Sequence, residues 1–262
     1  MIQMNTVDLP PDTLAHLKEK QDLVDGEADY AAKVARGKTL WDRKSKKHFR
    51  VVRFKLEEMC VGKHRCNYCE DSKADEVEHI EPKDMYPERV FVWSNYLLSC
   101  GPCNGPKNNQ FAVFDDSGNV VNVARKRDDP VIPPLKGDHV FINPRFENPL
   151  EFLMLDLKTF LFVAIPTISA KNKKRAEYTY TTLGLNSRDY LIEARKEAFG
   201  TYLDSLQLYV RRKNEEATEA ELAHRKQELN SRHHPTVWQE MKRWHKFYPE
   251  LDMLFTKAPE LL

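Results

Sequence analysis

The sequence carries almost no net charge, holds few cysteines and has no long apolar run. Its 41 Lys and Arg residues balance 40 Asp and Glu residues, so the formal net charge of +1 predicts no class of partner. Five cysteines in 262 residues are too few for a disulfide scaffold. The apolar stretches at residues 150–157 and 160–165 are shorter than the roughly 20 residues of a membrane span. The sequence therefore predicts neither a disulfide-rich secreted scaffold nor a membrane protein.

Two further signals are missing. Residues 1–11 contain no basic residue followed by an apolar block, so we expect no secretory signal and a cytoplasmic location. The chain has no glycine loop of the form G-x-x-x-x-G-K-[S/T], so nucleotide-driven gating would require another protein. A hydrophobic share of 41% is enough to bury a core, which predicts a globular protein.

Four of the five cysteines form two closely spaced pairs, Cys66 with Cys69 and Cys100 with Cys103. Two residues between cysteines allow both sulfurs of a tight turn to face one ion, and two such turns complete a tetrahedral site. The pattern predicts a structural Zn²⁺ site, with unpaired buried thiols or a redox dithiol as the competing interpretation. Cys60 stands outside the pattern and is expected to pack in the core, at the end of the amphipathic residues 49–59.

Polar side chains that suit hydrolytic chemistry lie between and just after the two cysteine pairs. Residues 75–82 are typical of a short strand that carries Glu78 and His79, which project apart unless the strand end redirects one of them. That arrangement suits a metal ligand beside a group that acts on water. Asn95 is placed to orient an imidazole, and residues 104–110 are expected to open a helix whose first amides favour anions.

The order of these motifs resembles the HNH, or ββα-metal, nucleases of the zinc-bearing type. A longer set of residues is similar to the HNH subunit of Septu-type antiphage defence systems, which occurs beside an ATPase and also with some retrons. The resemblance covers roughly residues 66 to 205. The first comparison rests on Cys66-x-x-Cys69, Glu78-His79-Ile80-x-Pro82, Asn95-x-Leu97 and Cys100-x-x-Cys103-Asn104-x-x-Lys107. The second rests on Trp93-x-Asn95-Tyr96-Leu97-x-Ser99-Cys100, Phe141 to Arg145, Asn148-Pro149, Gly184-Leu185-Asn186-x-Arg188 and Arg195.

The resemblance implies a role for each matching residue. It makes His79 the general base that takes a proton from water, with Asn95 orienting it through a hydrogen bond. Glu78 and Asn104 would ligate a catalytic metal, and Lys107 would lie near a phosphate. Many relatives have histidine where this chain has Asn104, and an amide oxygen favours Mg²⁺ or Mn²⁺ over zinc at the catalytic position.

We therefore expect an α+β protein, mostly helical, in which a ββα-metal motif is braced by a structural zinc. The expected function is metal-dependent hydrolysis of nucleic-acid phosphodiester bonds, with DNA favoured over RNA. The resemblance further implies antiphage defence and a partner ATPase that gates the nuclease, with no membrane involved. The alternatives are a freestanding HNH nuclease of restriction type and a non-catalytic zinc-ribbon module that binds nucleic acid or a partner.

The rest of the chain predicts supporting structure. Residues 41–55 form a basic cluster that suits phosphate contacts or a solvated helix face, and the apolar C-terminal residues fold back on the core or meet a partner. Arginines after residue 170 are interpreted mainly as solvated, although some of them suit a nucleic-acid groove. The predicted regions are 1–59, helical with the basic cluster; 60–112, the nuclease motif with zinc; 113–205, an α/β support; and 206–262, helical and a candidate for partner docking. A hairpin is predicted at residues 111–123, where the nuclease motif passes into the support.

Overall fold

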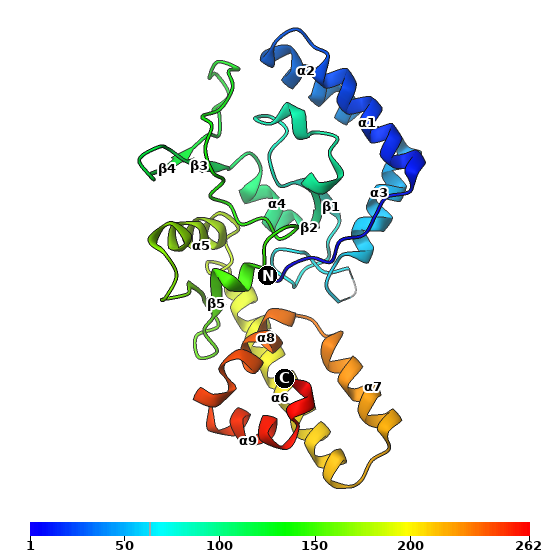
Figure 1. Cartoon of the computed structure of the whole chain (residues 1–262), viewed down its shortest axis with the longest axis vertical. Helices are drawn as coiled ribbons and strands as arrows, with labels where there is room; N and C mark the ends of the chain where they lie inside the picture. Colours follow the sequence, from blue (N-terminus) through cyan, green and yellow to red (C-terminus); the bar gives the residue numbers. More distant parts are fainter. Residues whose placement is uncertain (63) are drawn as a thin grey trace.

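The N-terminal part of the protein is a group of three helices. The structure, a computed structural model, describes residues 1–62 and 64–262 (Figure 1). Helix α1 (Pro11–Asp25) contacts α2 (Tyr30–Asp42) and α3 (Lys46–Glu58). Asp29 and Ser45 cap α2 and α3 by accepting hydrogen bonds from backbone amides. Because Phe49, Val52 and Leu56 share the buried face of α3, Phe54 lies on the opposite face and is 57% exposed.

The centre of the molecule holds two short strands and a short helix. Strand β1 (Glu76–His79) pairs antiparallel with β2 (Tyr96–Ser99), with Glu78 opposite Leu97. The 3-10 turns η1 (Pro87–Arg89) and η2 (Trp93–Asn95) lie in the connection, and α4 (Gly101–Lys107) follows β2 directly. The sequence predicted a helix that opens at Asn104, and this was wrong. The turn from Cys100 to Cys103 forms the start of α4, so Asn104 lies inside the helix.

Two further hairpins lie beside this centre. The hairpin predicted at residues 111–123 is confirmed as β3 (Ala112–Phe114) and β4 (Val120–Asn122). Its turn uses Gly118 at a φ of 75° and Asp115, whose carboxylate accepts the amides of Ser117 and Asn119. The turn η3 (Pro149–Glu151) leads into β5 (Leu153–Leu155) and β6 (Phe162–Ala164), which pair with each other and contact α8 and α5 respectively.

The C-terminal part is helical, as predicted. It comprises α5 (Ala170–Thr182), α6 (Asp189–Asn214), α7 (Glu219–Asn230), α8 (Pro235–Trp244), α9 (Pro249–Lys257) and the turns η4 (His245–Phe247) and η5 (Pro259–Leu261). Helices α6 to α9 form a lower lobe in Figure 1, and the boundary predicted after residue 205 falls inside α6. The tail folds back, because α9 and η5 bury Leu251, Leu254, Phe255 and Leu261.

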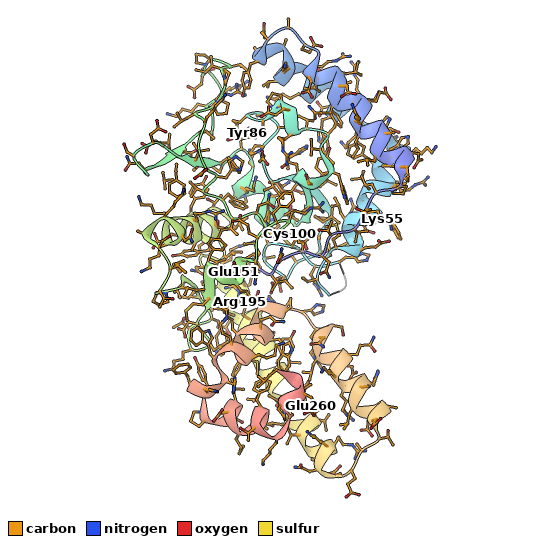
Figure 2. The ribbon with its side chains drawn as sticks, viewed as in Figure 1. Lys55, Tyr86, Cys100, Glu151, Arg195 and Glu260 are labelled. Carbon is orange, nitrogen blue, oxygen red and sulfur yellow. The ribbon has the colours of Figure 1, made fainter. Side chains whose placement is uncertain are left out.

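One apolar cluster runs through both parts of the molecule and includes residues of α1, β2, α6 and α8. Cys100 lies near the middle of the upper part and Arg195 near the junction of the two parts (Figure 2). Helices make up about 51% of the chain, which confirms the mostly helical mixed fold that we expected. Among the described residues, no helix is long and apolar enough to span a bilayer.

Candidate active site and metal centre

The four paired cysteines meet at one point, as predicted. Their Sγ atoms all lie within 4.8 Å of one another, and Cys69 Sγ is 3.7 Å from Cys100 Sγ. A tetrahedral zinc with bonds of about 2.3 Å places its sulfurs about 3.8 Å apart, so the four residues fit this ion. All four are buried. The arrangement is that of a structural zinc centre.

The metal centre joins a loop to the end of β2. Cys66 and Cys69 lie in the loop after α3, whereas Cys100 lies between β2 and α4 and Cys103 lies in the first turn of α4. The loop is tied to β2 by Asn67, whose backbone amide and Nδ2 both donate to the Leu98 carbonyl. A bound ion would therefore hold β2 and α4 in a fixed relation to the loop.

Arg188, which directly precedes α6, contacts the cysteine cluster. Arg188 Nη2 donates to Cys103 Sγ at 3.2 Å and to the Leu183 carbonyl, and Nε donates to the Gly184 carbonyl. Cys60 lies outside the cluster, as expected, and its Sγ donates to the Leu56 carbonyl. Burial raises the pKa of Cys60 to about 12, so its thiol stays protonated and unreactive.

His79 lines a polar pocket of about 330 Å³ beside the metal centre. Its ring is buried against Trp41, at a centroid distance of 4.2 Å, and its Nε2 lies 3.0 Å from the Val90 carbonyl. Because a carbonyl only accepts, Nε2 carries the proton and Nδ1 keeps its lone pair. Burial lowers the pKa of His79 to about 3. The imidazole is therefore neutral and able to accept a proton.

Asn95 supports the imidazole through the connecting loop and not by a direct bond. The Asn95 side chain accepts the Glu81 amide and donates to the carbonyls of Glu81 and Arg89, which holds the loop just before Val90. The sequence predicted a hydrogen bond from Asn95 to His79. The described hydrogen bonds instead place the Val90 carbonyl in that role, and the Tyr96 hydroxyl donates to the same carbonyl.

Glu78 and Lys107 form a buried pair. Lys107 Nζ lies 2.6 Å from Glu78 Oε1 and also donates to the His79 carbonyl. Burial raises the pKa of Glu78, while the Lys107 charge opposes that shift. The resemblance implied that Lys107 lies near a phosphate. In the structure Lys107 is fully buried and paired with Glu78, so its side chain is not open to a phosphate in this arrangement. Lys83 lines the same pocket and is only partly buried.

Asn104 and Glu76 complete the pocket. Asn104 Nδ2 lies 2.5 Å from Glu76 Oε2, and both residues line the pocket with Glu78. We did not predict Glu76 from the sequence, although the two-residue period of a strand places it on the same face as Glu78. The pocket thus gathers carboxylate and amide oxygens, which are the ligands that Mg²⁺ and Mn²⁺ prefer.

Trp41 and Val90 were also missed. Trp41 lies in the last turn of α2, far from His79 in sequence, and nothing in the local pattern points to a contact. Val90 acts through its backbone carbonyl, which is independent of the side chain. Arg195, which was interpreted as part of the family pattern, is buried and donates to the carbonyls of Phe160 and Leu185.

Comparison with known proteins gives one partial match. No protein-family model matches the chain. A segment of 58 residues is 47% identical to the Septu protein PtuB of Bacillus thuringiensis and covers 20% of this chain. The matched segment spans 23% of that protein, so the similarity is local and shows a relation to part of a Septu protein.

Proposed function

We propose that this protein is a metal-dependent nuclease of the HNH type that acts in antiphage defence. The observation that carries the proposal is the state of His79. Its ring is neutral, is fixed by the Val90 carbonyl through Nε2, and shares a pocket with Glu76, Glu78 and Asn104. The order of two strands and a helix around this pocket supports the same interpretation.

In this proposal His79 Nδ1 takes a proton from the water that attacks the phosphodiester. Positioned general bases contribute roughly 10² to 10⁴ in rate, and a neutral imidazole is ready for this step. Glu78 and Asn104 would hold a divalent cation, and Glu76 is close enough to Asn104 to assist. When bound, such a cation stabilises negative charge on the phosphate and on the leaving oxygen.

In this proposal Lys107 and Lys83 have different roles, one in holding Glu78 and the other in binding a phosphate. Lys107 is paired with Glu78 and stays buried, so it keeps this carboxylate in place and balances its charge. Lys83 lines the pocket from the loop after β1 and keeps part of its surface exposed. We therefore assign the phosphate contact to Lys83, and we expect substrate to approach from that side.

The biological setting rests on the local similarity to a Septu protein. We infer that the chain works in a defence system, that DNA is its favoured substrate, and that a partner ATPase controls it. The chain lacks a nucleotide-binding glycine loop, which supports a separate protein for that control. A cytoplasmic location follows from the same inference.

The test compares cleavage of plasmid DNA and total RNA by the purified wild type and by His79→Ala. The reactions contain Mg²⁺, Mn²⁺ or EDTA, and each is run with and without the proposed partner ATPase. The matched control is His224→Ala, since the His224 side chain is 71% exposed on α7. We expect His79→Ala and EDTA each to reduce cleavage by about 10² or more, with His224→Ala unchanged.

The alternatives give different results. Cleavage by the chain alone would favour a freestanding nuclease, whereas cleavage that requires the partner ATPase would favour a gated subunit. Equal cleavage by wild type and His79→Ala, with equal thermal melting curves, would overturn the assignment of His79. Zinc binding without cleavage under any condition would favour a non-catalytic binding module.

A further inference from the structure

The solvent side of α3 carries a group of exposed cations. This helix lies at the outer edge of the upper part of the molecule, as Lys55 marks in Figure 2. Lys46, Lys47 and Arg50 are exposed in its N-terminal half, and Arg43 is exposed just before it. In the part of the chain that the structure describes, none of these four side chains forms an ion pair or a hydrogen bond. We call these four residues the α3 cation patch.

Nearby acidic residues do not neutralise the α3 cation patch. Residues 41–58 contain seven Lys and Arg side chains and three carboxylates. The carboxylates of Glu57 and Glu58 are already paired with other cations of α3, at 3.3 and 2.9 Å. Asp42 is the third carboxylate, and it cannot balance four cations. The surface therefore keeps an excess of positive charge.

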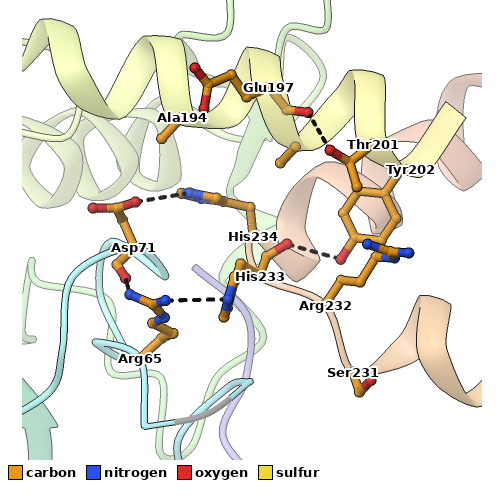
Figure 3. A pocket seen from close by; sticks show the side chains of 11 residues that line it. Arg65, Asp71, Ala194, Glu197, Thr201, Tyr202, Ser231, Arg232, His233 and His234 are labelled. Carbon is orange, nitrogen blue, oxygen red and sulfur yellow. Dashed lines mark hydrogen bonds and ion pairs between the residues drawn. The ribbon is translucent and has the colours of Figure 1, made fainter. Parts of the chain in front are cut away.

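Arg65 in the zinc-binding loop, which precedes β1, contrasts with the patch. It lines a cavity of about 470 Å³ beside α6, shown in Figure 3. One of its Nη atoms donates to the Asp71 carbonyl, and the other lies 3.3 Å from His233 Nε2. Arg65 thus holds the loop to the connection before α8, whereas the four cations of the α3 cation patch hold no other part of the fold.

The position of the patch is unfavourable for the helix itself. The first turn of α3 has no acidic residue and contains both Lys46 and Lys47. The first backbone amides of a helix carry partial positive charge, so cations there repel the amides as well as one another. A bound anion would remove this repulsion, because phosphate groups are stabilised near the start of a helix.

An exposed aromatic side chain continues the patch along the helix. Lys47, Arg50 and Phe54 are three and four residues apart, which places them on one face of α3. Lys47 and Arg50 lie about 4.5 Å apart along the helix axis. This separation suits two phosphates of one strand, which advance by about 3.4 Å per nucleotide along a duplex. Phe54 is 57% exposed one turn further on, where its ring is available to a sugar or a base.

The patch adjoins the pocket of His79. Lys44, which follows the first cation of the patch, places its Nζ 4.7 Å from the centre of the Trp41 ring. Trp41 in turn lies against the His79 ring, at a centroid distance of 4.2 Å. Trp41 and Lys83 both line the pocket. A strand held on the patch would therefore reach the pocket across Trp41 and meet Lys83 there.

We propose that the α3 cation patch binds the phosphate backbone of nucleic acid and guides the strand to the pocket of His79. Duplex DNA, single-stranded DNA and RNA share this chemistry, and the experiment below separates them. The proposal rests on the proposed function for the fate of the bound strand, whereas binding itself requires no cleavage.

The test is fluorescence anisotropy of the zinc-bound chain with labelled duplex DNA, single-stranded DNA and RNA, without added Mg²⁺ or Mn²⁺. The KCl concentration is varied from about 50 to 200 mM. Lys47→Gln/Arg50→Gln should weaken binding by about tenfold or more. It should also reduce the slope of log affinity against log salt concentration by about two, because each phosphate contact contributes about one. The matched control is Lys158→Gln/Arg211→Gln, which removes two exposed cations of other elements and changes the net charge equally.

A third variant and melting curves separate binding from folding. Phe54→Ser should weaken binding by about fivefold or more and leave the salt slope unchanged, because it removes a ring and no charge. All three variants alter exposed side chains, so their melting temperatures should match the wild type.

Three results would overturn the proposal. The first is equal affinity and salt slope in wild type and Lys47→Gln/Arg50→Gln. The second is an equal loss of binding in Lys158→Gln/Arg211→Gln. The third is competition by poly-glutamate that is as effective as competition by DNA, which would indicate an acidic protein as the partner of this face. Because no cleavage is required, failure of His79 as the general base would not change these outcomes.

Discussion

The buried carboxylate of Glu78 at the candidate active site is paired with the buried ammonium group of Lys107. Glu78 is nine-tenths buried or more and would be costly as an isolated carboxylate, and Lys107 is fully buried as well. Their contact at 2.6 Å offsets the desolvation of both groups. The same pair holds the end of β1 against the end of α4, because Lys107 also donates to the His79 carbonyl. The position of His79 therefore depends on a charge pair behind it.

Removal of Lys107 should destabilise the fold. Lys107→Met leaves Glu78 buried without its partner, which we expect to cost about 3–5 kcal/mol in the free energy of unfolding. The double variant Lys107→Met/Glu78→Gln removes both charges and should recover part of that loss. Urea denaturation of the three proteins measures this, with Lys83→Met as control because Lys83 is only partly buried. Equal stability of Lys107→Met and Lys83→Met would contradict the importance of the pair.

Arg188 should govern how tightly zinc is held. Its Nη2 donates to Cys103 Sγ, and outer contacts of this kind typically contribute 10- to 100-fold in metal affinity. We expect Arg188→Ala to lower zinc affinity by about tenfold or more in competition with a chromogenic chelator. Arg211→Ala serves as the control and should retain zinc as the wild type does. Identical zinc loss from both variants would show that the contact to sulfur has no effect on the metal.

At the scale of elements, the sequence predicted local structure well where residues interact with near neighbours. The strand around Glu78, the hairpin after Phe111 and the helices after residue 170 follow from alternation, turn residues and helical periodicity. The start of α4 was misjudged because polar residues after Cys103 resembled a helix start, whereas the cysteine turn itself begins the helix. Local patterns do not report a constraint that a distant cysteine pair imposes.

The site was predicted in part for the same reason. His79, Glu78 and Asn104 do line one pocket, because their spacing within a strand and a helix brings them together. The contacts that set their chemistry come from elsewhere in the chain, as with Trp41 on α2 and the Val90 carbonyl. Such contacts depend on the packing of separate elements, and no spacing rule in one sequence encodes them.

Zinc removal should loosen β2 and α4 before the distant helices. Cys100 and Cys103 flank this junction, and a small motif with little core of its own depends on the metal for its fold. We expect a chelator or Cys100→Ser to increase hydrogen exchange in residues 96–107, while α9 keeps its protection. Cys60→Ser is the control, because Cys60 lies outside the cluster and should leave zinc content unchanged. Unchanged exchange at β2 after zinc loss would contradict a structural role for the metal.

At the scale of the whole molecule, the C-terminal lobe is part of the core and not an appendage. Helix α6 runs between the upper part and this lobe, and its buried residues Tyr202 and Leu206 belong to the same cluster as Cys66 and Leu98 (Figure 1). Tyr202 stacks on Trp238 of α8 at a centroid distance of 5.4 Å. Thr236 of α8 also donates from its amide and its hydroxyl to the carboxylate of Glu70, the residue that follows Cys69. The lobe thus supports the zinc-binding loop.

A chain that ends at Asn214 should therefore fail to fold stably. It loses six buried apolar side chains of α8 and α9: Val237, Trp238, Met241, Leu251, Leu254 and Phe255. Burial of each is worth about 1.5–3 kcal/mol, so their sum is comparable to the roughly 5–15 kcal/mol by which a typical domain is stable. We expect the truncated chain to aggregate or to lose its cooperative thermal transition in circular dichroism.

The full-length variant Phe247→Ser/Met253→Ser separates the loss of buried side chains from the loss of exposed apolar side chains. Phe247 and Met253 are 75% and 51% exposed, so their replacement removes apolar area from the tail without opening the core. Its melting temperature should stay within a few degrees of the wild type, because surface substitutions usually change stability by about 0.5 kcal/mol or less. A cooperative transition of the truncated chain near the wild-type temperature would show instead that the upper part folds without its lower lobe. In that case the lobe would be free for another task, and deletion of the tail would become a valid test of partner binding.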